Sequence, residues 1–157
     1  MENSNHFNVI VIGAGISGIG AGYYLKKNCP NKSFCIIEGR ENIGGTWDLF
    51  KYPGIRSDSD MFTLGYAFKP WKEQKTIANG PSILSYLEET VEENNLREKI
   101  KFSHKVLSAN WNSAERNWEV RAAHHEQEIL LTANFLFMGT GYYNYCLLYT
   151  SPSPETR

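Results

Sequence analysis

Three glycines stand at positions 13, 15 and 18, in the run Gly13-Ala14-Gly15-Ile16-Ser17-Gly18. An apolar run at 9–12 precedes them, and a second apolar run at 34–37 ends in Glu38, twenty residues beyond Gly18. At this spacing the first glycine permits a tight turn, the second lets the backbone approach a pyrophosphate, and the third lets the following helix pack against the sheet. The N-terminus of that helix offers free N–H groups to phosphates, and Glu38 is placed to accept hydrogen bonds from ribose hydroxyls.

A lone G-x-G-x-x-G is weak evidence, because a glycine-rich turn occurs in many α/β proteins. In this chain the strand, the glycines, the helix, the second strand and the acid all stand at the required offsets, so the pattern predicts a nucleotide site. Residue 38 is acidic rather than basic, which favours an adenosine ribose without a 2′-phosphate. The dinucleotide expected at this loop is therefore NAD or FAD rather than NADP.

A second glycine pair opens the run Gly44-Gly45-Thr46-Trp47, and the stretch 52–58, Tyr-Pro-Gly-Ile-Arg-Ser-Asp, follows it. By spacing alone, this pair suggests another close approach of the backbone to a cofactor. Taken together, the two runs resemble the FAD-binding half of the class B flavoprotein monooxygenases, that is, the flavin-containing and Baeyer–Villiger monooxygenases. The resemblance covers about residues 7–145.

The resemblance implies that the chain holds FAD, and it carries over to named positions. Asp58 matches an acid near the flavin and the nicotinamide, which makes it the candidate catalytic residue, and Val106 stands where the backbone contacts the adenine. Three alternatives remain open: Trp47 as core packing, Asp58 as a turn cap, and Val106 as a plain strand residue. The positions that match cofactor-binding residues are Gly13, Gly15, Ser17, Gly18, Glu38, Gly45, Thr46, Trp47, Asp58, Val106, Gly139, Thr140 and Gly141.

Members of this family reduce FAD with NADPH and use molecular oxygen to oxygenate a soft nucleophile or a ketone. The glycine fingerprint that holds NADPH in the family is missing from these 157 residues, so the fragment alone is expected to be inactive. In the family the FAD domain is completed by chain from the far C-terminus. We therefore expect an open sheet edge, uncovered apolar surface, poor solubility and weakly bound flavin.

Two other functions stay open. A flavoprotein resembling the disulfide reductases would need a redox C-x-x-C or similar cysteine pair, which the sequence lacks. A non-catalytic module that binds FAD or NAD would need the tail of the chain to be native and the sheet to close on itself. The sequence decides neither the substrate, nor N/S-oxygenation against ketone oxidation, nor the oligomeric state.

Composition limits the partners. The formal net charge is -1, and without a basic excess a nucleic acid is not an expected partner. No apolar run reaches the roughly 18 residues of a membrane span. The three cysteines lack metal-ligand spacing, so we expect no metal site and a reducing, cytoplasmic location. His104, His124 and His125 also lack such spacing and an evident partner, and are interpreted as surface histidines.

The helices and strands are predicted from the periodicity of apolar residues and from the glycine and proline residues that end such elements. Strands are predicted at 7–12, 33–38, 100–111, 117–122 and 128–138, and helices at 17–28 and from Asn79-Gly80-Pro81 onward. The segment 42–61 is interpreted as a long functional loop, and 135–138 as a buried central strand. These elements predict an α/β fold: a Rossmann-like FAD-binding domain with a parallel sheet, helices and a small antiparallel β-meander, truncated.

Three segments differ in character. Residues 1–6 form a polar leader without an apolar signal region, and 7–145 form the incomplete FAD-binding domain. From Cys146 to the end, the run Cys-Leu-Leu-Tyr-Thr-Ser-Pro-Ser-Pro resembles the in-frame translation of a sequencing adapter, so 146–157 is interpreted as non-native. The alternative is a natural Ser/Pro-rich tail.

Overall fold

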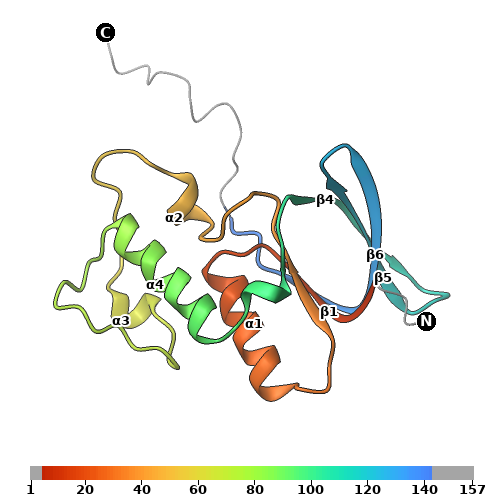
Figure 1. Cartoon of the computed structure of the whole chain (residues 1–157), viewed down its shortest axis with the longest axis horizontal. Helices are drawn as coiled ribbons and strands as arrows, with labels where there is room; N and C mark the ends of the chain where they lie inside the picture. The colour runs from red at the N-terminus through yellow and green to blue at the C-terminus, as the bar shows by residue number, and fades with distance from the viewer. Residues whose placement is uncertain (1–4, 143–157) are drawn as a thin grey trace, which may run out of the picture.

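The computed structural model describes residues 5–142, so the tail interpreted as non-native and most of the polar leader lie outside the described residues. The elements are β1 His6–Ile12, α1 Ile16–Asn28, β2 Phe34–Ile37, α2 Thr46–Leu49, α3 Met61–Leu64, α4 Gly80–Glu93, a 3₁₀ turn Arg97–Lys99, β3 Ile100–Lys101, β4 His104–Asn112, β5 Asn117–His124 and β6 Gln127–Met138 (Figure 1).

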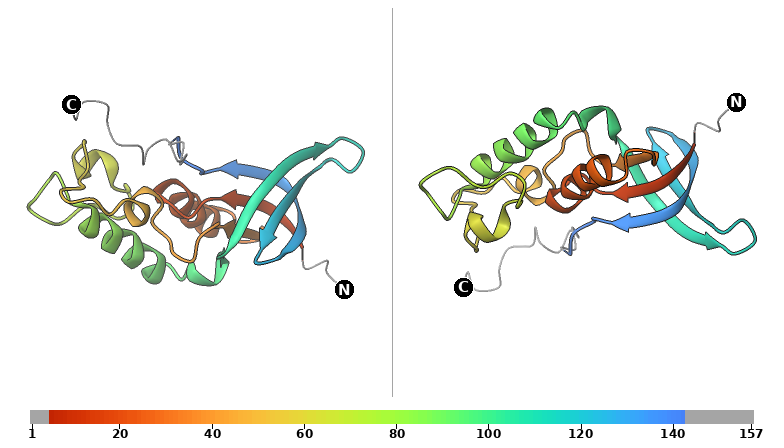
Figure 2. Two further views of the ribbon diagram at one scale, coloured as in Figure 1. Left: turned by 90° about the horizontal axis from the view of Figure 1, so that it is seen from above. Right: turned by 90° about the horizontal axis from the view of Figure 1, so that it is seen from below.

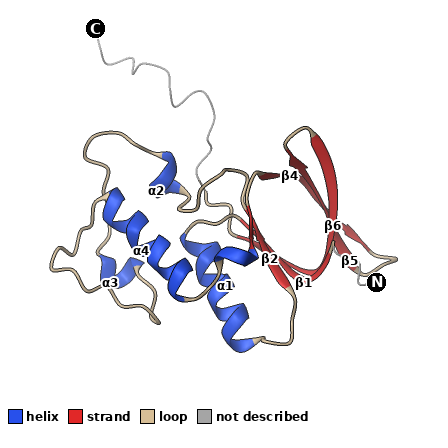
Figure 3. Cartoon of the chain, in the orientation of Figure 1, coloured by secondary structure: helices blue, strands red, loops and turns tan. Residues whose placement is uncertain are grey.

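The strands form one sheet in the order β3-β2-β1-β6-β5-β4. Figure 3 shows the strands in red and the helices in blue. Strands β3, β2, β1 and β6 run parallel, whereas β6, β5 and β4 pair antiparallel as a meander. The predicted α/β class, with a parallel sheet, helices and an attached antiparallel meander, is confirmed. Because β1 lies centrally, the loop that follows it emerges at the carboxyl edge of the parallel strands, where dinucleotide sites form.

Two cores occupy opposite faces of β1, because successive strand residues point to opposite sides. Val11 joins the core under the helices, with Ile19 of α1 and Leu87 of α4. Ile10 joins the second core, with Leu131 of β6 and other side chains of the meander. Figure 2 shows the helices grouped at one end of the molecule and the meander at the other. Residues 10–12 of this apolar run are therefore buried on both faces, whereas Val9 is half-buried.

Helix α1 ends and helix α4 begins at the residues that their sequence signals predict. Helix α1 stops at Asn28, just before Pro30, which cannot continue it. Helix α4 starts after Asn79, whose side chain accepts a hydrogen bond from the Ser82 N–H at 2.8 Å. The predicted loop at 42–61 is only partly a loop, because it contains the single-turn helix α2 and ends at the start of α3.

Strand β6 is central, as predicted, but its end is not buried. Phe135 is 72% exposed, Phe137 44% and Met138 61%. The register sets Phe135 beside Val9 and Phe137 beside Val11. Val9 and Val11 pack against the core under the helices, whereas Phe135 and Phe137 stay exposed. Pairing between β5 and β6 stops at Ala133, so within residues 5–142 the end of β6 has no strand on its second edge. The predicted open edge and uncovered apolar surface are thus present.

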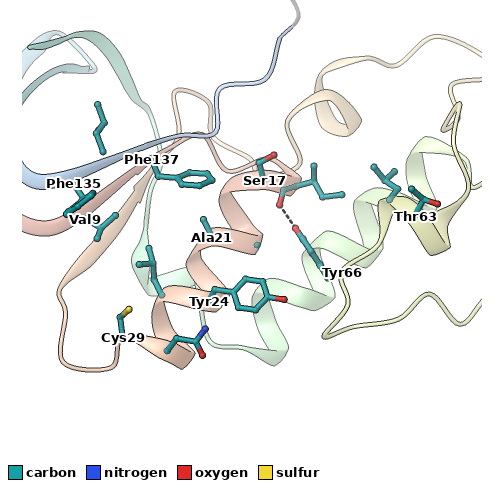
Figure 4. A pocket seen from close by; sticks show the side chains of 15 residues that line it. Val9, Ser17, Ala21, Tyr24, Cys29, Thr63, Tyr66, Phe135 and Phe137 are labelled. Carbon is teal, nitrogen blue, oxygen red and sulfur yellow. Dashed lines mark hydrogen bonds between the residues drawn. The ribbon is translucent and has the colours of Figure 1, made fainter.

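A large hollow lies over this bare face, between α1 and the end of β6 (Figure 4). Its volume is about 900 Å³, and Val9, Ala21, Tyr24, Phe135 and Phe137 are among the side chains that line it. This wall is almost wholly apolar, so it suits a packed protein segment better than a phosphate-bearing ligand. Within residues 5–142, no helix has the length and apolar character needed to cross a membrane.

The exposed phenyl groups should make the chain prone to aggregation. We expect Phe135→Ser to lower light scattering and binding of an apolar dye about twofold, because it removes apolar surface from a contiguous patch. Phe62→Ser is the matched control: Phe62 is 68% exposed but lies on α3, outside the lining of this hollow. Both variants should unfold within about 0.5 kcal/mol of the parent chain. Equal effects of the two variants would show that the patch has no special role.

Candidate dinucleotide site

The turn between β1 and α1 is built by the first glycine. Gly13 has φ +98°, and a Cβ there would lie 2.5 Å from the Gly139 carbonyl oxygen. The Gly13 N–H donates to the Ile37 carbonyl at 2.7 Å, and the Gly139 N–H donates to the Ile12 carbonyl at 2.8 Å. The loop is therefore tied to the carboxyl ends of β1, β2 and β6 together.

The other two glycines of the motif have different roles. A Cβ on Gly18 would lie 1.8 Å from the Gly13 carbonyl oxygen, so α1 crosses the turn in direct contact. A Cβ on Gly15 would meet backbone atoms of Gly45 at ordinary distances, the Cα at 3.5 Å and the nitrogen at 3.9 Å. Gly15 caps α1 without a side-chain bond, and the first turn of α1 carries no acid, which leaves its positive end available to an anion.

The second glycine pair packs onto the first loop. The Gly44 N–H donates to the Ala14 carbonyl at 2.9 Å, and a Cβ on Gly45 would lie 3.0 Å from the Gly15 Cα. Gly44 and Gly45 both have positive φ, +111° and +56°, a region that side-chain-bearing residues rarely adopt. The two loops thus form one glycine-walled cradle, into which backbone groups can approach a ligand closely.

Glu38 closes the cradle from the end of β2. It is 7% exposed, and its Oε2 accepts a hydrogen bond from the Ala14 N–H at 2.9 Å. Its Oε1 accepts from the Arg40 N–H at 3.0 Å. The backbone is held too, since the Glu38 carbonyl accepts from the His104 N–H at 2.8 Å. The Glu38 carboxylate is therefore fixed beside the first glycine loop by one backbone N–H on each oxygen. An acid at this place is the one that accepts hydrogen bonds from ribose hydroxyls in dinucleotide-binding folds.

These residues surround one hollow of about 580 Å³, within the usual range for a cofactor or ligand pocket. Gly18 lies beneath the hollow rather than in its wall, in keeping with a packing role. Asp58 is separate: it lines another hollow, with Tyr52 and Arg56. The predicted residues that line the main hollow are Gly13, Gly15, Ser17, Glu38, Gly45, Thr46, Trp47, Val106, Gly139, Thr140 and Gly141.

Two of these residues serve packing as well as the hollow. Trp47 lines the hollow and also packs against the core under the helices, so the core alternative describes part of its role. Val106 lines the hollow from β4, packs against the second core, and adjoins a register shift between Val106 and Ser108. A backbone contact from Val106 to adenine stays a prediction.

Sequence reasoning missed three polar residues in the wall: Arg40, His104 and Lys105. Arg40 stands two residues after the acid and bonds to Asp48 across the second glycine loop. The available signal was a basic residue two positions after the acid Glu38. His104 and Lys105 come from the start of β4, whose position beside β2 is set by long-range pairing rather than by a local motif.

The interpretation of the histidines as residues without partners is wrong. The His104 and His124 rings stack with centroids 4.1 Å apart, and those of His124 and His125 lie 4.3 Å apart. His104 Nδ1 pairs with the Phe102 carbonyl, and His124 Nδ1 with the Ser103 carbonyl at 3.2 Å. The hairpin register, which sets His104 opposite His124, brings these imidazoles together.

Burial lowers the pKa of His104 below its ordinary value; the Phe102 carbonyl opposes this, and the charges of His124, Lys101 and His125 add to it. The unfolded chain therefore binds this proton at a higher pH, so the contribution to stability is complete above about pH 6.5 and is lost as the pH falls. We expect His104→Asn to flatten the dependence of unfolding free energy on pH between 7.5 and 5.5 in urea titrations. A dependence on pH that is unchanged in His104→Asn would contradict this expectation.

Comparison with known proteins agrees with this geometry. Residues 11–73 match the family of NAD(P)-binding Rossmann-like domains. The chain is 51% identical over 151 residues to the FAD-containing monooxygenase EthA of Mycolicibacterium smegmatis, covering 96% of this chain and 31% of EthA. It is 50% identical over 149 residues to the probable FAD-binding monooxygenase AlmA of an Acinetobacter species, covering 94% of this chain and 30% of AlmA. The chain thus spans about a third of the length of these relatives.

Solved structures give the same picture. An oxidised steroid monooxygenase bound to NADP superposes with a TM-score of 0.78 at 30% identity, over 87% of this chain and 26% of that protein. The open form of cyclohexanone monooxygenase superposes with a TM-score of 0.79 at 29% identity, over 88% of this chain and 27% of that protein. The described fold therefore corresponds to one part of much longer enzymes.

Proposed function

We propose that this chain, a homologue of the FAD-containing monooxygenases over about 31% of their length, binds FAD in the hollow between its two glycine loops. The observation that carries the proposal is the buried Glu38 carboxylate, bonded to the Ala14 N–H beside a wall in which Gly13 and Gly45 require glycine. The cradle fits a dinucleotide, because its wall is formed by glycine backbone. A Cβ at Gly15 would extend from this wall and contact Gly45.

Each part of the hollow suits one part of the cofactor. Glu38 accepts from the hydroxyls of the adenosine ribose, and the N-terminus of α1 with Gly15 and Gly45 holds the pyrophosphate. Val106 and its neighbours at the start of β4 would bound the adenine end of the cofactor, and Trp47 would bound the other end. When bound, FAD supplies the redox chemistry; the protein orients it and excludes water.

For the longer protein we propose a monooxygenase that uses FAD, NADPH and molecular oxygen on a small-molecule substrate, by ketone oxidation or N/S-oxygenation. Relatives described as FAD-containing monooxygenases and neighbours such as cyclohexanone monooxygenase support it. Asp58 remains the proposed catalytic acid, and it lines a hollow separate from the cofactor cradle. A cytoplasmic location also stays a prediction.

We also propose that residues 7–145 are an incomplete FAD-binding domain and that 146–157 are not native. The bare face of β6 supports the first part, because Phe135 and Phe137 are side chains that further protein would cover. Reading the gene beyond the codon for Tyr145 tests both. Continuation into a second G-x-G-x-x-G supports them, and a genuine stop after Arg157 contradicts them.

A disulfide-reductase function has little support. Cys29 and Cys35 are free thiols, and burial raises the pKa of Cys35 to about 12, so it stays protonated and unreactive. A non-catalytic nucleotide-binding module is the second candidate, because the cofactor hollow is lined without Asp58, the candidate catalytic residue. The open edge at the end of β6 counts against this second candidate.

The direct test is a fluorescence titration of the 157-residue chain with FAD, with NAD as the competitor. We expect weak, saturable FAD binding that ADP displaces and NAD displaces poorly. Gly15→Ala should abolish binding without unfolding the chain, because its methyl group would enter the cradle. A folded chain that ignores FAD, or that prefers NAD, would overturn the proposal.

A further inference from the structure

Arg40 connects three parts of the wall of the cradle. Its Nη2 donates to the Gly45 carbonyl at 2.9 Å, and its Nη1 donates to Asp48 Oδ2 at 3.2 Å. Its Nε lies 3.5 Å from Glu38 Oε1. One guanidinium therefore contacts the ribose-binding acid, the second glycine loop and the first turn of α2.

These contacts continue into the first glycine loop. Ala14 donates its N–H to Glu38, Glu38 pairs with Arg40, and Arg40 holds the Gly45 carbonyl. Gly45 in turn lies against Gly15, closing a ring of contacts around the wall of the hollow. The fork-shaped guanidinium can serve three acceptors in fixed directions, which a lysine ammonium on a flexible stem cannot.

Charge supports the same reading. The side chains lining the described hollow include the carboxylate of Glu38 and the cations Arg40 and Lys105. Asp48 adds a further negative charge close by. A pyrophosphate brought into this wall meets two acids, and Arg40 is the cation that contacts both of them. Its charge offsets theirs where the second loop faces the ligand.

We propose that Arg40 is a positioning residue that sets the second glycine loop for the pyrophosphate of the dinucleotide. The inference rests on the proposed function, since it needs a dinucleotide in this hollow. It adds a residue that neither the glycine fingerprint nor the acid at its end predicts. Its action is specific to phosphate, because the ribose-binding Glu38 is also held by two backbone N–H groups that do not depend on the guanidinium.

The test compares three ligands on the 157-residue chain: FAD by fluorescence, and ADP and adenosine by displacement of FAD. Arg40→Gln removes the charge and the fork but keeps the backbone N–H to Glu38. We expect it to weaken FAD and ADP about 10- to 100-fold and adenosine less than about threefold. Arg40→Lys, which restores the charge alone, should recover part of the loss.

Arg121→Gln is the matched control, because Arg121 makes a surface ion pair with Glu128 at 2.7 Å outside the hollow. It should leave all three affinities unchanged. If Arg40→Gln fails to fold, Arg40→Lys serves as the test: it keeps the positive charge but loses the planar fork, and it should weaken ADP more than adenosine.

The outcomes separate the two ideas. A parent chain that binds no FAD contradicts the proposed function, and this inference with it. A parent chain that binds FAD while Arg40→Gln weakens ADP and adenosine equally overturns the inference alone, because Arg40 then acts only through general support of the fold. Unchanged ADP affinity in Arg40→Gln overturns it as well.

Discussion

Replacing Gly18 with alanine is expected to lower the free energy of unfolding of the 157-residue chain by about 3 kcal/mol and to abolish FAD binding. The new Cβ would lie 1.8 Å from the Gly13 carbonyl oxygen and 2.9 Å from its carbon. Both are backbone atoms, so the clash cannot be relieved by turning a side chain. Helix α1 would have to lift from the turn, which would move the N-terminal amides that we propose bind the phosphates. Urea denaturation followed by circular dichroism measures the loss.

Gly15→Ala separates stability from binding. Its Cβ would meet the Gly45 Cα at an ordinary 3.5 Å, and Gly15 has φ −81°, which alanine adopts readily. We expect an unfolding free energy within about 0.5 kcal/mol of the parent, together with lost FAD binding. A Gly18→Ala chain as stable as the parent would contradict the close crossing of α1 over the turn.

The contrast between these glycines shows what a sequence can predict. Spacing alone indicated that Gly13, Gly15 and Gly18 have separate tasks, because the motif combines a turn, a ligand and a helix contact within six residues. The strands β1 and β2 and the helix α4 were equally predictable, since their apolar periodicity and caps are local. Local signals predict local structure, and the first glycine loop of the cradle is local structure.

Other features depend on contacts that no local signal carries. The separation of Asp58 from the cradle follows from the path of the loop after α2, and the stacking of His104 on His124 follows from the β4–β5 register. The burial of β6 was overestimated for the same kind of reason. An apolar run indicates that a surface must be covered, but it does not say whether the covering segment belongs to this stretch of chain.

Arg40 shows that a residue can stand at a visible position in the sequence while its contacts stay unpredictable. Its position two residues after Glu38 is visible in the sequence, yet its importance depends on the Gly45 carbonyl and the Asp48 carboxylate reaching it through the fold. The candidate site is thus predictable in its backbone and less so in its charges.

Glu38→Gln is expected to weaken FAD binding about 100-fold, the second large effect. The carboxylate is buried and accepts one backbone N–H on each oxygen, from Ala14 and from Arg40. An amide has one accepting oxygen, so its NH₂ group must face one of these N–H donors without a hydrogen bond. The folded chain should lose about 2 kcal/mol, and the ribose hydroxyls lose a charged acceptor in addition.

Two further variants decide whether the charge or the shape of Glu38 matters. Glu38→Asp keeps the charge on a shorter stem, and we expect it to bind FAD more weakly than the parent but better than Glu38→Gln. Glu128→Gln removes a carboxylate from the exposed pair with Arg121 and should change FAD affinity and unfolding by no more than experimental error. If Glu38→Gln bound FAD like the parent while its stability fell, the carboxylate would be a structural tie between β2 and the glycine loop, and the ribose would have to bind elsewhere.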